Sequence, residues 1–176
     1  MADFDVFLPM LLGFEGGFVD DPADPGGATN KGITLTTFGL CAQSLLGVEP
    51  SLDNLKALTD AQAGIIYKAR YWDPIRAGQY PSQNLANIVF DFYVNAGTNA
   101  TKTLQSVLNG LGAALTVDGS IGPASLQALA NADADEVYRQ YKTARIDYYQ
   151  NLVARQPSLS RFLKGWLNRV NSFPDV

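Results

Sequence analysis

Apolar residues recur at intervals of three and four along most of the chain, and this spacing constrains the fold more than any other feature of the sequence. It is the spacing of one face of an amphipathic helix. The first such set is Phe4, Phe7, Leu8, Leu11 and Leu12. The same spacing marks residues 35–46, 59–72, 83–96, 100–111, 133–155 and 157–170. Because helices of this kind bury their apolar faces against one another, we expect a mainly α fold.

Residues 16–33 interrupt the helical pattern. This stretch is rich in Asp, Pro and Gly, which form turns, and it has no period of 3.6 residues. We expect a long loop that ends in a short β-hairpin around residues 29–33. The first helix should be capped by Asp5, carry Pro9 in its first turn and end at Gly16-Gly17.

Other boundaries follow from capping and breaking residues. Thr59 and Gln62 have the spacing of a capping box, and that helix should stop before Asp73-Pro74. Pro123 or Ala124 should open a short helix after a turn-rich break, and Asp133 should cap a long one. We expect residues 1–97 and 98–176 to form two regions packed as one compact unit.

The chain contains no histidine and a single cysteine, Cys41. The absence of histidine excludes Ser-His-Asp and Cys-His catalysis and any histidine-bound catalytic metal. A general acid must therefore be Asp, Glu, Lys or Tyr. One cysteine cannot form an intramolecular disulfide or a thiolate cage, so we expect no metal and no cofactor, and a buried Cys41.

The charge is unevenly distributed. Residues 1–60 contain nine acidic and two basic residues, whereas residues 61–176 contain eight acidic and eleven basic ones. The bases are spaced along helices rather than clustered, so we expect no nucleic acid partner. No apolar run is long enough to span a bilayer, and the acidic start lacks the basic region of a signal peptide. We expect a monomer that is made in the cytosol. If its target lies outside the cytoplasmic membrane, another component must release it.

Glu15 is the first candidate for chemistry. Cleaving a glycosidic bond requires a proton for the leaving group, and a carboxyl in an apolar site can supply it. Glu15 follows Phe14 at the end of an apolar helix and precedes Gly16 and Gly17, which let a sugar approach the backbone closely. The alternative is an ordinary glutamate at a helix end, facing water.

A second group of candidates lies on the loop after Glu15. Asp20, Asp21 or Asp24 could position a water molecule, and Thr29 and Asn30 could hold a water or an N-acetyl group. The alternatives are turn-forming aspartates, or a hairpin that uses Thr29 and Asn30 for its own hydrogen bonds.

Two later positions could bind substrate. Tyr71 and Trp72 end a helix, and aromatic rings stack on the apolar faces of sugars; the alternative for Trp72 is core packing. Asp91 and Asn95 are one helical turn apart and share a face, which either lines a cleft or caps a neighbouring loop.

The first motif resembles glycoside hydrolase family 108, the Glu-Gly-Gly-Tyr type. The residues that carry this resemblance are Phe14-Glu15-Gly16-Gly17-Phe18, Asp21-Pro22, Asp24, Gly26-Gly27, Thr29, Gly32-Ile33-Thr34, Tyr71-Trp72-Asp73-Pro74, Leu85-Ala86, and Asp91 with Asn95-Ala96-Gly97. The second half resembles the predicted peptidoglycan-binding domain that accompanies the family. That similarity is carried by Asp118-Gly119, Ile121-Gly122-Pro123 and the segment 164–170. Phe18 departs from the usual Tyr and removes a hydroxyl beside the acid.

The resemblance implies a lysozyme-like helical fold and an N-acetylmuramidase that cleaves the β-1,4 MurNAc–GlcNAc bond of peptidoglycan. It implies that Glu15 is the catalytic acid, with Asp24 and Thr29 as candidates for the base and its water. Family members include phage endolysins, released by a holin, and muramidases linked to bacterial secretion, and the sequence does not separate them.

Two alternatives remain open at this stage. A lytic transglycosylase also needs one acid and differs in leaving a 1,6-anhydro end. A wall-binding module without catalysis would account for the basic second half but not for the Glu15 motif.

Overall fold

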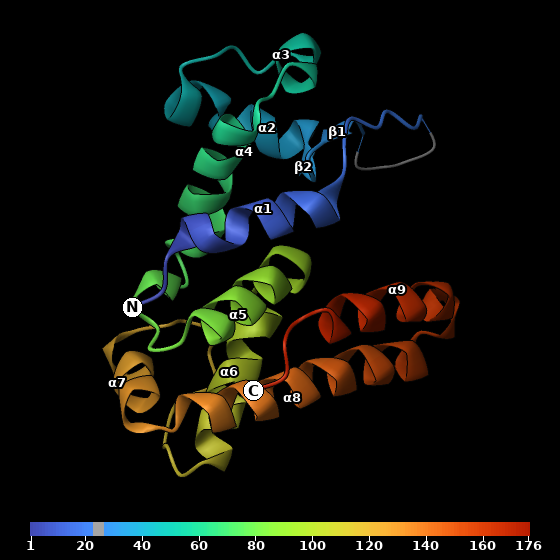
Figure 1. The fold of residues 1–176 in the computed structure, drawn as a ribbon. Helices are drawn as coiled ribbons and strands as arrows, with labels where there is room; N and C mark the ends of the chain where they lie inside the picture. Colours follow the sequence, from blue (N-terminus) through green and yellow to red (C-terminus); the bar gives the residue numbers. More distant parts are fainter. Residues whose placement is uncertain (23–26) are drawn as a thin grey trace. The chain divides into compact units, whose positions relative to one another are not determined.

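The computed structural model describes residues 1–22 and 27–176, and these confirm a mainly helical fold with a short hairpin after the first helix (Figure 1). The chain forms two compact units. We call residues 4–72 the hairpin unit, and residues 1–3 with 73–176 the helical unit. Within the described residues, no helix has both the length and the hydropathy needed to cross a membrane.

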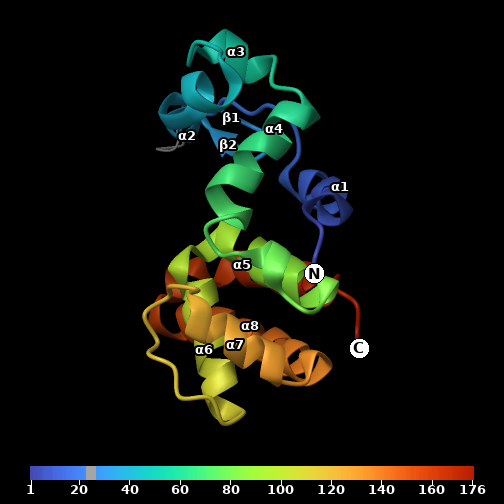
Figure 2. The same ribbon diagram turned by 90° about the vertical axis from the view of Figure 1, so that its left-hand side faces the viewer.

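The hairpin unit combines helices with two short strands. Its elements are α1 (Phe4–Glu15), β1 (Thr29–Asn30), β2 (Ile33–Thr34), α2 (Leu35–Cys41), α3 (Leu52–Lys56) and α4 (Asp60–Tyr67). A π-helical turn, Ala42–Leu46, continues α2, and another, Lys68–Trp72, continues α4. The hairpin, α2 and α3 gather at one end of α4 (Figure 2). The short helix α3 was not expected from the sequence.

Side-chain caps define several helix starts in this unit. Thr34 caps α2, Ser51 caps α3, and Thr59 with Gln62 forms the expected capping box at the start of α4. The expectation for α1 was wrong in two details. The helix already begins at Phe4, so Asp5 lies in its first turn rather than at the cap, and Pro9 lies inside the helix.

The core of the hairpin unit explains how α1 is held. Phe4, Phe7 and Leu11 form the buried face of α1, and the Phe4 ring meets the Trp72 ring edge to face at 5.5 Å. A methyl group on Gly64 of α4 would lie 2.8 Å from Leu8 Cδ2. A side chain on Gly64 would require Leu8 to shift, so the glycine allows Leu8 of α1 to pack directly on α4.

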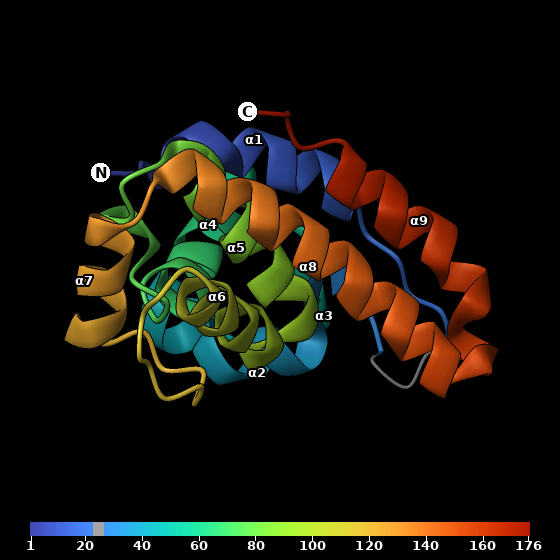
Figure 3. The same ribbon diagram turned by 90° about the horizontal axis from the view of Figure 1, so that it is seen from below.

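The remaining α-helices lie in the helical unit. They are α5 (Gln83–Ala96), α6 (Thr98–Gly110), α7 (Pro123–Asn131), α8 (Ala134–Arg155) and α9 (Ser160–Asn171), with 3₁₀ turns at Ala77–Gln79 and Pro157–Leu159. Pro123 opens α7 and Asp133 caps α8, as the sequence predicts. α9 lies alongside α8, and α5 and α6 pack on the other part of α8 (Figure 3).

The loop between α6 and α7 is anchored by one buried side chain, Gln105. Its amide donates hydrogen bonds to Asp118 Oδ1 at 2.9 Å and to the Ser120 carbonyl at 3.0 Å, and its oxygen accepts one from the Gly119 N–H at 2.8 Å. The bond from the Gln105 amide to Oδ1, together with one from the Ser120 N–H, lowers the pKa of the exposed Asp118. The Asp118-Gly119 motif is thus a structural turn in this fold.

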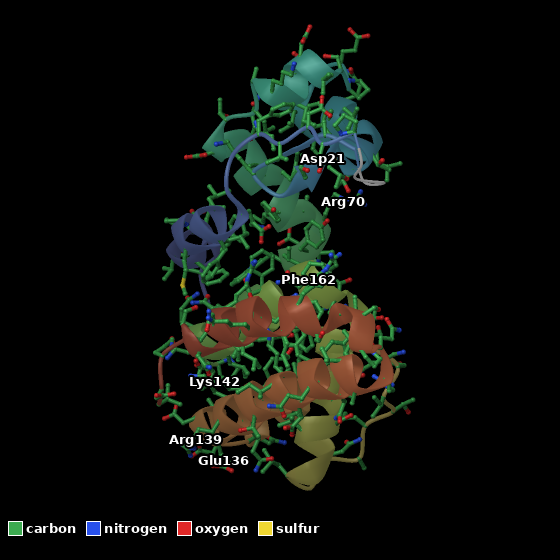
Figure 4. The ribbon with its side chains drawn as sticks, turned by 90° about the vertical axis from the view of Figure 1, so that its right-hand side faces the viewer. Asp21, Arg70, Glu136, Arg139, Lys142 and Phe162 are labelled. Atoms are coloured by element: carbon green, nitrogen blue, oxygen red, sulfur yellow. The ribbon has the colours of Figure 1, made fainter. Side chains whose placement is uncertain are left out.

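The C-terminal residues are tied to the first half of α8. Tyr138 donates a hydrogen bond to the Pro174 carbonyl at 2.6 Å, and Lys142 pairs with Asp175 at 2.7 Å. Arg139 pairs with Glu136 at 2.8 Å and also reaches the Val176 carbonyl. Figure 4 shows Glu136, Arg139 and Lys142 along this part of α8.

Candidate active site

Glu15 is the last residue of α1 and is half-buried. Gly16 follows in the left-handed region, with φ +71°, which L side chains rarely adopt. A left-handed glycine is the usual way to end a helix, because it lacks the Cβ that would clash there. The sequence therefore stops α1 immediately after the glutamate, and the carboxyl stands where the chain leaves the helix.

The hairpin turn lies directly against this carboxyl. Lys31 and Gly32 are the two turn residues, with φ +51° and +76°, the pattern of a type I′ turn. A methyl group on Gly32 would lie 2.5 Å from Glu15 Oε2 and 2.5 Å from the Tyr67 hydroxyl. The α-carbon of Gly32 is thus packed between these two groups.

Tyr67 is a site residue that the sequence analysis did not identify. Its ring is buried, and its hydroxyl donates a hydrogen bond to the Lys31 carbonyl at 2.8 Å. Lys31 in turn forms an ion pair with Asp60 at 2.7 Å. The turn beside Glu15 is therefore held by α4 at two points, the start of the helix and its end.

The chain between Glu15 and the hairpin is also held. Val19 and Thr29 exchange two backbone hydrogen bonds, of 2.8 and 2.7 Å, and so form an isolated antiparallel β-bridge beside β1. Phe18 is 37% exposed, with the Lys56 ammonium 5.3 Å from its ring centre. Gly16, Gly17, Asp20 and Asp21 are exposed along this segment (Figure 4 labels Asp21).

Tyr71 and Thr29 adjoin the residues that form and hold the turn. Tyr71 is half-buried, and its ring centre is 5.7 Å from that of Tyr67, at a tilt of 43°. Thr29 is half-buried in β1, two residues before the turn. The other predicted member of the catalytic set, Asp24, lies outside the described residues.

Asn30 has a structural role in this fold. It is 5% exposed, and its amide donates hydrogen bonds to the Leu55 carbonyl at 2.9 Å and the Lys56 carbonyl at 3.2 Å. These carbonyls belong to the end of α3, where backbone acceptors have no partner within the helix. The expected contact with an N-acetyl group is therefore corrected, because the amide is occupied by α3.

The expected sugar contacts of Trp72 and Asp91 are corrected for the same reason. Trp72 is 3% exposed and packs on Phe4. Asp91 is 0% exposed and bonds to two arginines of the helical unit, with Oδ2 2.7 Å from Arg145 and Oδ1 2.7 Å from Arg169. Neither side chain exposes enough surface to stack on or bond to a sugar.

Asn95 differs from its neighbour one turn earlier. Its side chain is exposed, although its amide also donates to the Asp91 carbonyl at 2.8 Å. Asp91 and Asn95 share one face of α5, as expected, but the face runs from a buried ion cluster to the surface. Among the predicted residues of α5, only Asn95 remains available to a ligand.

The described residues contain no group of three or more His, Cys, Asp or Glu side chains arranged to hold a metal ion. Cys41 is buried, as expected; burial raises the pKa of its thiol, although the charge of Arg70 acts in the opposite direction. Its Sγ donates to the Thr37 carbonyl at 3.2 Å. Cys41 is therefore part of the core of the hairpin unit.

The chemistry available at this site is proton transfer by one carboxyl. Glu15 is fixed at a helix end and has a hydrogen-bonded turn on one side, and the exposed glycines 16 and 17 leave the backbone approachable beside it. A carboxyl held in this way can give a proton to a leaving-group oxygen. Such a site suits the cleavage of an acetal.

The comparisons with known proteins agree with this chemistry. A family model described as Glycosyl hydrolase 108 matches residues 8–97, just over half of the chain, and one described as Predicted Peptidoglycan domain matches residues 99–171. The solved structure of Brucella abortus SagA is similar, with 34% sequence identity over 96% of this chain and 89% of that chain, and a TM-score of 0.76. None of the curated proteins matches the chain. The resemblances that the sequence motifs indicated are thereby confirmed.

Proposed function

Because the chain belongs to glycosyl hydrolase family 108 and carries a peptidoglycan domain behind the family segment, we propose that it is an N-acetylmuramidase. The bond cleaved is the β-1,4 bond between MurNAc and GlcNAc of bacterial peptidoglycan. Glu15 is the general acid. The observation that supports this role is the packing of its carboxyl against the Gly32 turn, at the end of α1.

In this mechanism the Glu15 carboxyl protonates the glycosidic oxygen as the C–O bond breaks. Water then attacks the anomeric carbon, and its proton passes to a second group. Thr29, half-buried in the strand that leads to the turn, and Asp24 are our candidates for holding and activating that water. Gly16, Gly17, Asp21, Tyr71 and Asn95 are our candidates for substrate contacts.

The test compares Glu15→Gln with the wild-type protein on purified peptidoglycan. Gln is isosteric but cannot donate the proton, so the variant should fold normally and lose about two to four orders of magnitude in rate. Mass spectrometry of the fragments should show reducing MurNAc ends from wild type. Glu49→Gln, the same change at an exposed glutamate of the hairpin unit, is the control and should remain active.

The products also decide between related mechanisms. In a lytic transglycosylase the 6-hydroxyl of MurNAc attacks in place of water. Fragments with 1,6-anhydro ends would therefore show that the protein is a transglycosylase and not a muramidase. Binding of peptidoglycan by both proteins without any released fragment would leave only a wall-binding module. Full activity of Glu15→Gln would remove Glu15 from the mechanism.

We further propose that residues 1–97 form the catalytic region, that residues 98–176 bind peptidoglycan, and that the protein lyses a bacterial host at the end of a phage cycle. Peptidoglycan lies outside the cytoplasmic membrane, so a holin would have to release the protein. Cytosolic expression should therefore lyse cells only when a holin is co-expressed, measured as loss of culture turbidity. Lysis by the protein alone would contradict holin dependence.

A further inference from the structure

Helix α9 leaves part of its apolar face exposed. Of its twelve residues only Val170 is buried. Phe162, Leu163, Trp166 and Leu167 lie on the same side of the helix but keep part of their surface exposed, and Phe162 is 42% exposed. A single exposed apolar side chain is ordinary on a protein surface, so the inference depends on what orients the Phe162 ring and on the charges beside it.

The exposed ring is the outer end of a stack that begins in the core. Tyr149 of α8 is 4% exposed and stacks on Trp166 at 5.0 Å and 22°. Trp166 stacks on Phe162 at 5.8 Å and 28°. The stack fixes the orientation of Phe162, which Figure 4 labels at the surface of α9. A ring held in this way binds a flat apolar face without losing much further conformational freedom.

The charged residues of α9, the helix that carries the outer part of the stack, are all basic. The Arg161 guanidinium lies 4.6 Å from the centre of the Phe162 ring, and α9 contains no Asp or Glu. In the part of the chain that the structure describes, neither Arg161 nor Lys164 forms an ion pair, whereas Arg169 is bound to Asp91. A cation without an acidic partner beside an exposed ring suits a ligand that carries both an apolar face and a carboxylate.

We propose that Arg161, Phe162 and Trp166 form a platform that binds the glycan strand of peptidoglycan. An N-acetylated sugar ring packs with its apolar face against the part of the Phe162 ring that Arg161 and Trp166 leave exposed, and the Arg161 guanidinium pairs with a carboxylate of the stem peptide. The inference rests on the proposed function for its ligand class. What it adds is the location of the binding surface on α9. This helix lies within the peptidoglycan domain, because the match to that domain covers residues 99–171 and α9 ends at Asn171.

The test uses the full chain with Glu15→Gln, so that peptidoglycan is not digested during the measurement. Added Phe162→Ala should weaken co-sedimentation with purified insoluble peptidoglycan about tenfold, and added Arg161→Gln about threefold. Val117→Ala is the control for losing an exposed apolar side chain, since Val117 is 43% exposed elsewhere in the helical unit. Lys164→Gln removes the same charge from the same helix and should change binding little.

Circular dichroism and thermal melting check that each variant is folded. Arg161 is exposed, so Arg161→Gln tests the platform even if Phe162→Ala melts early. Unchanged binding by a folded Phe162→Ala and by Arg161→Gln overturns the proposal. Equal losses for Arg161→Gln and Lys164→Gln with no effect of Phe162→Ala also overturn it, because general attraction between charges would then be sufficient.

A lipid surface is the competing ligand for an aromatic and basic helix face. Vesicles containing anionic phospholipid serve as the probe. If Phe162→Ala loses vesicle binding but keeps peptidoglycan binding, the face is a membrane contact and the proposal fails. The muramidase assignment is tested by a separate experiment, and it fails if the fragments released by the wild type carry no reducing MurNAc ends. Loss of binding in Phe162→Ala would then still support the platform.

Discussion

Gly32 shows how a single residue joins the backbone geometry of a turn to the position of a reacting group. The type I′ turn requires φ above zero at this position, and the α-carbon lies between the Glu15 carboxyl and the Tyr67 hydroxyl. Any side chain would both strain the backbone and push against the proposed general acid. The glycine is therefore needed for two separate physical reasons.

The two reasons can be separated by experiment, because Gly47 has a similar φ of +66° with no atom within 4 Å of a built Cβ. Gly32→Ala and Gly47→Ala should each lose about 1 kcal/mol of unfolding free energy from the left-handed backbone. Only Gly32→Ala should also displace Glu15, lowering kcat on peptidoglycan by about tenfold or more. Urea unfolding and initial rates are measured for both variants.

Wild-type kcat in a folded Gly32→Ala would show that the carboxyl can move aside without consequence, contradicting the geometry. Equal kcat losses in Gly32→Ala and Gly47→Ala would attribute the effect to general instability.

The residues of the site differ in how far the sequence could predict them. Glu15 was identified as the candidate acid by the family motif around it, since its local pattern alone also fits an ordinary glutamate at a helix end. Tyr67 leaves no such signal, since its ring occupies an ordinary buried position of α4 and only the fold brings its hydroxyl to Lys31. Asn30 and Asp91 were misassigned because a polar residue that satisfies a buried partner looks the same in sequence as one that faces a ligand.

At the scale of elements, Asp91 holds three helices together. It lies on α5 and bonds to Arg145 of α8 and to Arg169 of α9. Arg145 is completely buried and also lies over the Phe92 ring, 4.9 Å from its centre. The Asp91 carboxylate supplies the negative charge that offsets both arginines. Without it, the buried positive charge of Arg145 would strongly destabilise the fold.

Asp91→Asn should therefore destabilise the protein strongly, by about 3–5 kcal/mol, because the buried Arg145 and the partly buried Arg169 lose their counter-charge. Asn95→Ala, one turn along the same helix at an exposed position, should change stability by less than about 1 kcal/mol. Both are measured by urea unfolding. A loss below about 1 kcal/mol in Asp91→Asn would mean that water or another group reaches the arginines.

The positions of most helices were predictable because their apolar period and their caps agree, as at Thr59 and Asp133. Two kinds of detail could not be predicted. The chain enters α1 at Phe4, before Asp5, and packing against Trp72 at this end explains the earlier start. The π-helical turns that continue α2 and α4 were also not predicted, because the prediction rested on the 3.6-residue period of an α-helix.

At the scale of the whole molecule, the structural units and the family segments divide the chain at different places. The compact units separate between residues 72 and 73, whereas the matches to the two family models meet between residues 97 and 99. α5 belongs to the first family segment but packs on α6 and α8 in the helical unit. The sequence indicates a break near residue 97 because Gly97 ends a helix there. Local sequence signals do not show which other helices that helix packs against.

The helical unit should make the whole molecule sensitive to alkali. Burial, with a smaller contribution from the charge of Asp175, raises the pKa of Tyr138 to about 12, and burial also raises the pKa values of Tyr80 and Tyr141. In the unfolded chain a tyrosine has a pKa of about 10. Above that pH the unfolded state has lost protons that the folded state keeps, so ionisation favours unfolding. The stability contributed by these hydroxyls is complete below pH ~10 and is lost as pH rises through the folded pKa values.

Tyr138 gives this prediction its sharpest test, because its hydroxyl donates the hydrogen bond that fastens the Pro174 carbonyl to α8. The unfolding free energy of the wild type should fall steadily from pH ~10 to ~12. Tyr138→Phe removes the titrating group, so this variant should start less stable at pH 8 but decline less steeply over the same interval. Urea unfolding at each pH measures both slopes. A wild-type stability that stays level to pH ~12, or parallel slopes in the two proteins, would show that the buried Tyr138 hydroxyl does not govern the alkaline transition.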